Sequence, residues 1–379
     1  MKKLSYIITV ILAIWICPVS AQNTKPEAKE STYQNTSFYD VTPVNRKFSR
    51  KKPKNVILLI GDGMSIPQIY AGMTANKGNL NLNNFKHVGF SKTYSANRYV
   101  TDSGAGGTAI ATGHKTNNSA IGVDSSKNSV PSILEIAQAN GLATGIVVTT
   151  NILDATPAAF VAHVPNRSMM ADIAVDFTET GPDVFIGGGR EYFKNGKDGR
   201  NLLSELTAKG YHVCDTITEL VKIRSGKLAG LLTENRVSKR GDQLPVTTGV
   251  ALDILDDHKK GFFLMVEGSE IDGGGHSNDI TYTVEEMLDF DRAVGKALEF
   301  AAKDGKTLVV VTADHETGGL TLVDGDLSTG KITGRYSTSG HTGLMVPVFA
   351  YGPGAEVFGG IDENTSFFNK FISLLKLKQ

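Results

Sequence analysis

The residues best suited to chemistry lie between Val100 and Thr108, in the stretch V-T-D-S-G-A-G-G-T, where the hydroxyl of Ser103 follows the carboxylate of Asp102. Glycine and alanine come directly afterwards, so backbone N–H groups can approach an anion closely. A helix that begins there would direct the positive end of its dipole at Ser103. A phosphate or sulfate group would fit this position. The same residues also fit an ordinary Asp-Ser cap on a small-residue helix, so this stretch alone leaves both interpretations open.

Other polar side chains follow apolar runs that are typical of buried strands. The run from Asn55 to Ile60 ends in a Gly-Asp-Gly turn, and similar runs each lead into a polar loop. A turn with a capping aspartate would also explain the first of these loops. The side chains collected in this way are Asp62, Asp154, Thr156, Glu267, Asp272, His276, Asp314, His315 and His341. Arg167 lies in a separate loop and could hold a phosphate with two parallel hydrogen bonds, although a lone loop arginine is usually a surface residue.

The alternation of strands and helices predicts an α/β fold with a central, mostly parallel sheet flanked by helices on both faces. The strands expected in the sheet are residues 55–60, 143–150, 182–189, 262–266, 307–313 and 346–351. The helices expected are residues 65–75, 104–113, 131–140, 169–180, 201–210, 246–260, 281–303 and 365–375. Residues 320–340 are polar and glycine-rich and predict a hairpin. Because Asp272 and His276 are separated by three glycines, we expect them in a loop.

The amino terminus resembles an export signal, with two lysines, an apolar run and an A-x-A-like cleavage site before Gln22. We therefore predict a signal peptide over residues 1–21, a flexible linker over 22–54 and a single catalytic domain over 55–379, in an exported protein that is periplasmic or secreted. Cleavage removes Cys17 and leaves Cys214 alone, so no internal disulfide can form. Two alternatives are an uncleaved anchor and a lipidated Cys17, but the run is shorter than a spanning helix and Ile16 is bulky for a lipidation site.

The 379 residues carry equal numbers of basic and acidic side chains, and the calculated pI is near 7.1. This balance gives no support for a nucleic-acid partner. The basic cluster between Arg46 and Lys52 could contact anionic lipid or another polyanion, although such a run after an export signal is also typical of a solvated linker.

The polar side chains predict a metal site. Mixed imidazole and carboxylate ligands suit zinc, whereas the all-oxygen group of Asp62, Thr156 and Glu267 suits magnesium. Two metal ions can hold both the attacking and the leaving oxygen of an in-line displacement at phosphorus. The attacking oxygen here would be that of Ser103, and a bound zinc ion would lower the pKa of its hydroxyl.

The chain resembles the alkaline phosphatase family over residues 55–351. The resemblance rests on the motifs V-T-D-S-x-A-G-G-T-A, D-A-T-P-A-A, V-E-G-S-x-I-D, T-A-D-H and G-H-T-G. It implies hydrolysis of phosphate monoesters through a phosphoserine, two zinc ions and one magnesium ion, and a homodimer in many members. Small phosphate monoesters would be the partners, without stable membrane insertion. Residues 320–340 would correspond to a short form of the crown-like insertion that longer members carry.

The resemblance also assigns roles. Ser103 would be the nucleophile and Arg167 the phosphate clamp. The first zinc ion would have Asp272, His276 and His341 as ligands, and the second would have Asp62, Asp314 and His315. Magnesium would take Asp62, Thr156 and Glu267, with Asp154 acting through water.

One departure is Gly273, since many family members have lysine, histidine or tryptophan directly after the zinc-binding aspartate. Two other functions stay open at this point. One is a phosphodiesterase or nucleotide pyrophosphatase of the same superfamily, although those relatives more often use threonine as nucleophile. The other is a periplasmic phosphate- or zinc-binding protein without turnover.

Overall fold

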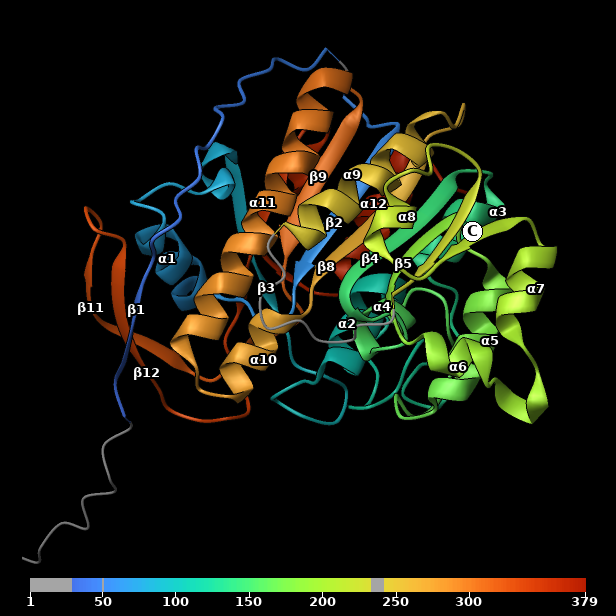
Figure 1. Ribbon diagram of the computed structural model, residues 1–379, viewed down its shortest axis with the longest axis horizontal. Helices are drawn as coiled ribbons and strands as arrows, with labels where there is room; N and C mark the ends of the chain where they lie inside the picture. The colour runs from blue at the N-terminus through green and yellow to red at the C-terminus, as the bar shows by residue number, and fades with distance from the viewer. Residues whose placement is uncertain (1–28, 50, 233–241) are drawn as a thin grey trace, which may run out of the picture.

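A ten-stranded sheet forms the centre of the molecule in the computed structural model, which describes residues 29–49, 51–232 and 242–379 (Figure 1). In order across the sheet, the strands are β15 (Gly360–Glu363), β3 (His87–Lys92), β14 (Val346–Tyr351), β9 (Thr307–Thr312), β2 (Asn55–Gly61), β8 (Phe262–Gly268), β4 (Ala143–Asn151), β5 (Val184–Gly188), β7 (Lys227–Leu231) and β6 (Tyr211–Cys214). Strand β14 is antiparallel to β3 and β9, and every other neighbouring pair is parallel. The predicted mostly parallel sheet is confirmed.

The sheet is buried on both faces because its central strands alternate apolar side chains between two cores. On β2, Ile57 and Leu59 belong to one core, while Val56, Leu58 and Ile60 belong to the other. The first core is completed by α1 (Ile66–Ala75), α9 (Gln243–Asp256) and α11 (Ile280–Asp304). The second is completed by α2 (Ser103–Thr112), α3 (Ile133–Ala139), α5 (Met170–Thr180), α7 (Leu202–Ala208) and α12 (Ser366–Leu375). Figure 1 shows α9 and α11 in front of the strands and α12 behind them.

Shorter elements lie at the ends of these strands and helices. They are α4 (Ala155–Ala158), α6 (Arg190–Lys194), α8 (Ile217–Leu220), α10 (Glu270–His276) and the 3-10 turns Asn81–Asn84, Lys197–Gly199 and Ala355–Phe358. A two-stranded ribbon pairs β10 (Glu316–Thr317) with β13 (His341–Thr342). No helix in the described part of the chain is long and apolar enough to cross a membrane.

The predicted hairpin at residues 320–340 is formed by β11 (Leu320–Asp326) and β12 (Lys331–Tyr336). A third strand, β1 (Ser31–Gln34), pairs antiparallel with β12 and extends the hairpin to a three-stranded sheet. The prediction of a flexible linker over residues 22–54 is therefore wrong for residues 31–39, and the rest of the predicted domain division stays a prediction. Asn35 is buried and donates to the carbonyl of Ala75, and the hydroxyl of Tyr39 donates to Asp291 at 2.6 Å. The predicted signal peptide, residues 1–21, lies outside the described residues and stays a prediction.

Strand register brings the polar loops to one level. Ile60 is paired with Glu267 of β8 on one side and with Thr312 of β9 on the other. Because the three strands are parallel, the residues just beyond them, including Asp62 and Asp314, emerge side by side at the carboxyl edge of the sheet.

Candidate active site and metal centre

Ser103 is the first residue of α2, and its hydroxyl lies 3.2 Å from Nε2 of His315. Asp102 is the N-cap of the helix, because its carboxylate accepts a hydrogen bond from the N–H of Ala105 at 3.0 Å. Capping and presentation of a hydroxyl are therefore both realised here. Gly106 lets the helix approach Asp314 closely, since a Cβ atom at Gly106 would lie 3.1 Å from that side chain.

One cluster of possible metal ligands consists of Asp272, His276 and His341. The Nε2 atoms of the two histidines lie 3.2 Å and 3.6 Å from the carboxylate oxygens of Asp272 and 3.2 Å from each other. Ligands about 2.0 Å from a tetrahedral ion are separated by roughly 3.3 Å, so these spacings fit zinc.

The outer nitrogens of these histidines support the same interpretation. Nδ1 of His276 lies 2.6 Å from the carbonyl of Ser339, and Nδ1 of His341 lies 2.9 Å from the carbonyl of Thr101. A carbonyl can only accept, so each Nδ1 donates its hydrogen, and in the neutral ring Nε2 is the nitrogen that can bind a metal.

A second cluster adjoins the first and consists of Asp62, Asp314 and His315. Nε2 of His315 lies 3.3 Å from Oδ2 of Asp314 and 3.6 Å from Oδ1 of Asp62. Asp272 also lies within 4.8 Å of Asp62 and His315, so its carboxylate stands between the two clusters. The hydroxyl of Ser103 contacts this second cluster at His315.

Three buried carboxylate oxygens of the site have no hydrogen-bond partner among the described residues: Oδ1 of Asp62, Oε2 of Glu267 and Oδ2 of Asp314. Buried charged oxygens without partners are strongly unfavourable, and a bound cation removes that cost. The donor set therefore fits divalent metal ions.

Burial changes the acid–base behaviour of these groups. It raises the pKa of Glu267 to about 8 and, together with the negative charge of Asp272, raises the pKa of Asp314 to about 7. Burial also lowers the pKa of His315 well below its ordinary value, which keeps the imidazole neutral, as a metal ligand must be. Burial alone would raise the pKa of Asp272, but the hydrogen bond from His276 and the charges of the neighbouring histidines together outweigh it and keep that pKa low.

An oxygen-only group lies on the β4 side of Asp62. Thr156, in α4, donates to Oδ2 of Asp62 at 3.4 Å, and Thr150 donates to Asp154 at 3.1 Å. Glu267 at the end of β8 lies close enough to Asp154 for that carboxylate to raise its pKa further. Hydroxyl and carboxylate oxygens without nitrogen are the ligands that magnesium prefers.

Arg167 reaches the site from a loop whose backbone is hydrogen-bonded to a neighbouring loop. Its N–H donates to the carbonyl of Ser119 at 2.7 Å, and the N–H of Ser119 donates to Asp102 at 2.8 Å. The guanidinium lies 3.7 Å from the same carboxylate, so Asp102 positions both Ser103 and Arg167. Together with ligands of both clusters, they line a cavity of about 240 Å³, large enough for a phosphoryl group.

Comparison with known proteins decides the family. The family model described as alkaline phosphatase matches residues 53–332. The chain belongs to the alkaline phosphatase family. Relatives in this family include alkaline phosphatase 4 of Bacillus subtilis, 36% identical over 87% of this chain and 90% of its own, and the alkaline phosphatase of Escherichia coli, 32% identical over 87% and 88%. The similarity indicates a phosphoric monoester hydrolase.

A solved alkaline phosphatase structure confirms the fold. The enzyme from the Antarctic bacterium TAB5 is 42% identical and superposes with a TM-score of 0.81, covering 87% of this chain and all of its own. A variant of that enzyme was solved with Mg bound in its M3 site.

The structure brings all the predicted site residues to one edge of the sheet, with one correction to their setting. Asp272 and His276 lie in the helix α10, so the predicted loop is wrong. The glycines between them allow close packing instead, because a Cβ atom at Gly274 would lie 2.5 Å from the backbone nitrogen of Thr283. Sequence reasoning also missed Thr317, whose hydroxyl donates to Asp272 and lies 3.3 Å from Nδ1 of His315. Its place two residues after His315 was the available signal.

Proposed function

We propose that this alkaline phosphatase family member hydrolyses phosphate monoesters through a phosphoserine intermediate on Ser103. The observation that carries the proposal is the position of the Ser103 hydroxyl at a helix N-terminus, 3.2 Å from His315 and in the same cavity as Arg167. A binding protein needs donors for an anion, but it does not need a hydroxyl directed at a cluster of metal ligands.

Arg167 would hold two phosphate oxygens with its planar guanidinium, and the N-terminus of α2 would face the same group. The oxygen of Ser103 attacks phosphorus, a new P–O bond forms, and the bond to the ester oxygen breaks; the proton lost by Ser103 ends on that oxygen, which leaves as alcohol or phenol. Water then attacks phosphorus on the side opposite the Ser103 oxygen, the P–O bond to Ser103 breaks, inorganic phosphate leaves, and a proton from the water ends on Ser103. Asp102 holds Arg167 and the first turn of α2 in the same relative position during both steps.

Two zinc ions and one magnesium ion are the proposed cofactors. Bound in the site, they would supply positive charge and lower the pKa of the serine hydroxyl and of the attacking water. Their ligands would be Asp272, His276 and His341 for the first zinc ion, Asp62, Asp314 and His315 for the second, and Asp62, Thr156 and Glu267 for magnesium, with Asp154 acting through water.

Gly273 lines the same cavity, and its lack of a side chain has a structural reason. A Cβ atom there would lie 2.3 Å from a carboxylate oxygen of Glu270, so a larger residue would displace Glu270 and its hydrogen bond with Tyr282. Glu270 also lines the cavity, so this part of the site presents a carboxylate and no direct basic contact to phosphate.

We further propose export to the periplasm or the medium, on the sequence of residues 1–21, and a homodimer, on the family resemblance. Exposed apolar side chains support a contact surface near the site: Ile66 and Tyr70 on α1 and Met345 after β13, where the hydroxyl of Ser65 donates to the Met345 carbonyl at 3.4 Å. Analytical ultracentrifugation of the wild type and of Tyr70→Arg tests the dimer. A wild type that sediments as a monomer contradicts it.

Hydrolysis assays test the proposed function. The rates of hydrolysis of an aryl phosphate monoester and of the matching diester are compared at about pH 7 and about pH 9.5, first with chelator and then after zinc and magnesium are restored. We expect monoester hydrolysis that rises with pH and returns with metal. A clear preference for the diester would favour the phosphodiesterase alternative, and metal and phosphate binding without turnover would favour the binding protein.

A further inference from the structure

The end of the molecule opposite the site carries a concentration of positive charge that hydrolysis does not use. We define the basic face by residues 46–49, 51–54, 256–260, 303–306 and 373–378. These segments hold eleven basic side chains and three aspartates, although the whole chain has equal numbers of both charges. The basic residues are Arg46, Lys47, Lys51, Lys52, Lys54, Lys259, Lys260, Lys303, Lys306, Lys376 and Lys378.

Hydrogen bonds to main-chain carbonyls join these segments into one surface. Arg46 donates to the carbonyl of Lys303 at 2.8 Å, and the N–H of Lys54 donates to the carbonyl of Lys306 at 2.8 Å. Lys52 donates to the carbonyl of Ser373 at 3.0 Å. Carbonyl acceptors are neutral, so these contacts hold the cations side by side without cancelling their charge.

Two more contacts extend the surface. Lys54 donates to the carbonyl of His258 at 3.4 Å, and Lys260 donates to the carbonyl of Asn140 at 3.2 Å. The side-chain amide of Asn140 in turn donates to the carbonyl of Lys378 at 2.9 Å. Among the eleven cations of the basic face, only Lys306 has an acidic partner in the described chain, Asp304 at 3.9 Å.

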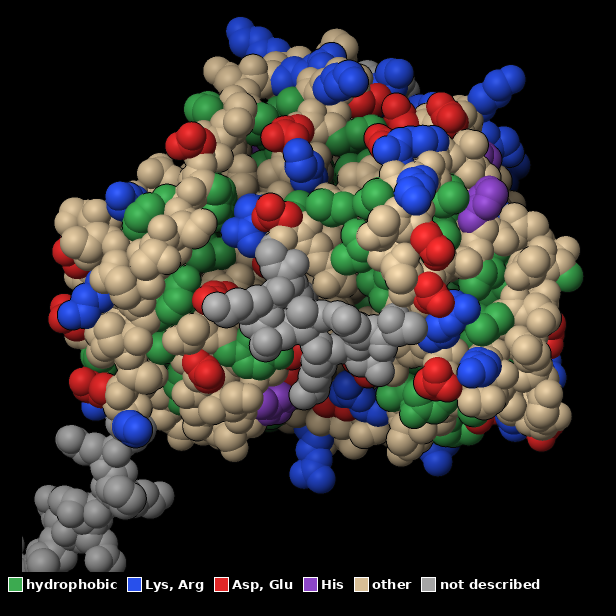
Figure 2. Space-filling view, viewed as in Figure 1, with side chains coloured by type: hydrophobic (Ala, Val, Ile, Leu, Met, Phe, Trp, Pro, Cys, Tyr) green, Lys and Arg blue, Asp and Glu red, His purple; other side chains and the backbone are tan. Residues whose placement is uncertain are grey.

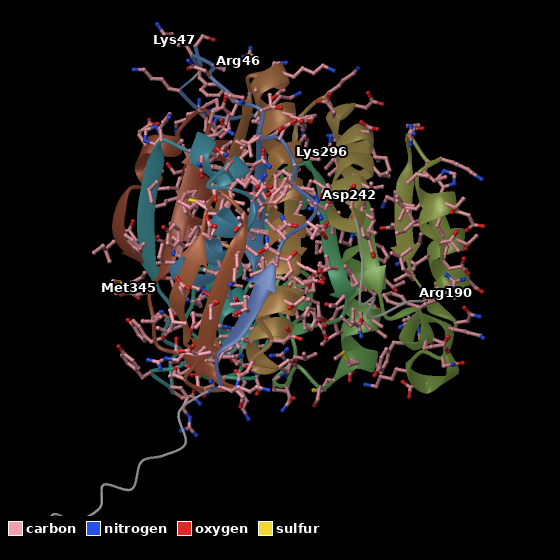
Figure 3. All side chains as sticks on the ribbon, turned by 60° about the vertical axis from the view of Figure 1, so that its left-hand side comes forward. Arg46, Lys47, Arg190, Asp242, Lys296 and Met345 are labelled. Atoms are coloured by element: carbon pink, nitrogen blue, oxygen red, sulfur yellow. The ribbon has the colours of Figure 1, made fainter. Side chains whose placement is uncertain are left out.

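The basic face lies at the amino ends of the strands, where Asn55 and Thr307 begin β2 and β9. The site lies beyond the carboxyl ends of the same strands. The seven residues of β2 place the two about 20 Å apart. Figure 2 shows Lys and Arg side chains gathered along the top of the molecule, and Figure 3 shows Arg46 and Lys47 at the upper end and Met345, which follows His341, toward the lower end.

The chemistry of the face favours one kind of partner. Ten of its eleven cations are lysines, and ten are exposed. No large apolar side chain is exposed within its described segments, so the face can neither insert into a bilayer nor stack on nucleic-acid bases. Compact, hydrated lysine charges on one surface suit diffuse attraction to anionic lipid headgroups, which depends on salt.

We propose that the basic face binds the anionic surface of a lipid membrane reversibly and turns the cavity of Ser103 away from that surface. This contact needs no ester hydrolysis, so it stands or falls independently of the proposed function.

Sedimentation with vesicles tests the proposal. The full chain is mixed with vesicles that contain about 30% phosphatidylglycerol in phosphatidylcholine, or phosphatidylcholine alone, at about 50 mM and 500 mM salt. The test variant is Lys51→Glu/Lys259→Glu, since neither side chain has a described contact. The matched control is Lys194→Glu/Lys331→Glu, which changes the net charge equally elsewhere on the surface.

We expect the wild type and the control to sediment with anionic vesicles at low salt and to be released at high salt. Each basic side chain contributes roughly five-fold to binding, so the test variant should bind at least about 25-fold more weakly. Circular dichroism checks that both variants are folded. The proposal would be overturned if the wild type did not bind anionic vesicles at low salt, or if both variants lost binding equally. Binding to duplex DNA or heparin, but not to vesicles, would overturn the lipid as partner.

Discussion

Removing the metal ions should make the stability of the protein fall steeply as pH rises. Burial raises the pKa of Glu267 from 4.5 to about 8 and that of Asp314 from 3.8 to about 7. A pKa that is raised in the folded state stabilises the fold below the unfolded value and loses that contribution as pH rises through the folded value. Between pH 6 and pH 9, linkage gives a loss of about 3 kcal/mol for Glu267 and about 1 kcal/mol for Asp314, or about 4 kcal/mol together.

The pKa shift of His276 acts in the same direction and adds to this loss of stability. Its hydrogen bond to Asp272 raises its pKa to about 9, so the stability that protonated His276 contributes also disappears toward alkaline pH. Bound metal ions would reverse the trend, because they favour the ionised carboxylates and the neutral histidine.

Urea unfolding followed by circular dichroism is the assay, at pH 6 and pH 9 with chelator and again with zinc and magnesium. The matched control is Glu267→Gln, which keeps the shape but cannot ionise. In chelator it should lose about 3 kcal/mol less than the wild type between the two pH values. The reasoning is refuted if the chelated wild type is equally stable at both pH values, or if metal leaves the pH dependence unchanged.

Three further changes have defined outcomes. Arg167→Lys should lower kcat/KM for an aryl phosphate at least about ten-fold, because lysine cannot form two parallel hydrogen bonds to phosphate; an unchanged value argues against the clamp. Gly274→Ala should lower the free energy of unfolding in urea by about 2–3 kcal/mol, because its Cβ atom would collide with the backbone of Thr283. A decrease of less than about 0.5 kcal/mol contradicts that packing. His163→Gln should cost about 1 kcal/mol below pH 6, and the cost should shrink as pH rises, because the hydrogen bond with Glu135 raises the pKa of His163. A cost that does not depend on pH contradicts the last expectation.

The central sheet was predictable because its strands are buried on both faces and therefore appear as continuous apolar runs, as from Asn55 to Ile60. Strand β15, at one edge of the sheet, and its neighbour β3 were not predicted. Exposed residues interrupt both, and Val88 and Ile361 are exposed themselves. Strand β1 was missed for another reason: its pairing with β12 joins residues about 300 apart, and no local pattern reports such a contact.

The site was largely predictable as a set of residues but not in its supporting contacts. Polar side chains after parallel strands converge by topology alone, as Asp62 and Asp314 do. The carbonyls of Ser339 and Thr101, which orient two histidines, leave no trace in the sequence because every residue has a carbonyl. The glycines before His276 were misread because a helix that packs closely and a flexible loop favour the same residue.

The most direct test of the account is to trap the phosphoserine. The enzyme with zinc and magnesium is mixed with an aryl phosphate, quenched in acid within milliseconds, digested and examined by mass spectrometry. We predict one phosphorylated peptide, with the phosphate on Ser103, and neither that peptide nor turnover in Ser103→Ala, which should still bind inorganic phosphate. Sustained hydrolysis by Ser103→Ala within a few-fold of the wild-type rate, or a phosphoryl group on another residue, would contradict a serine nucleophile at this position.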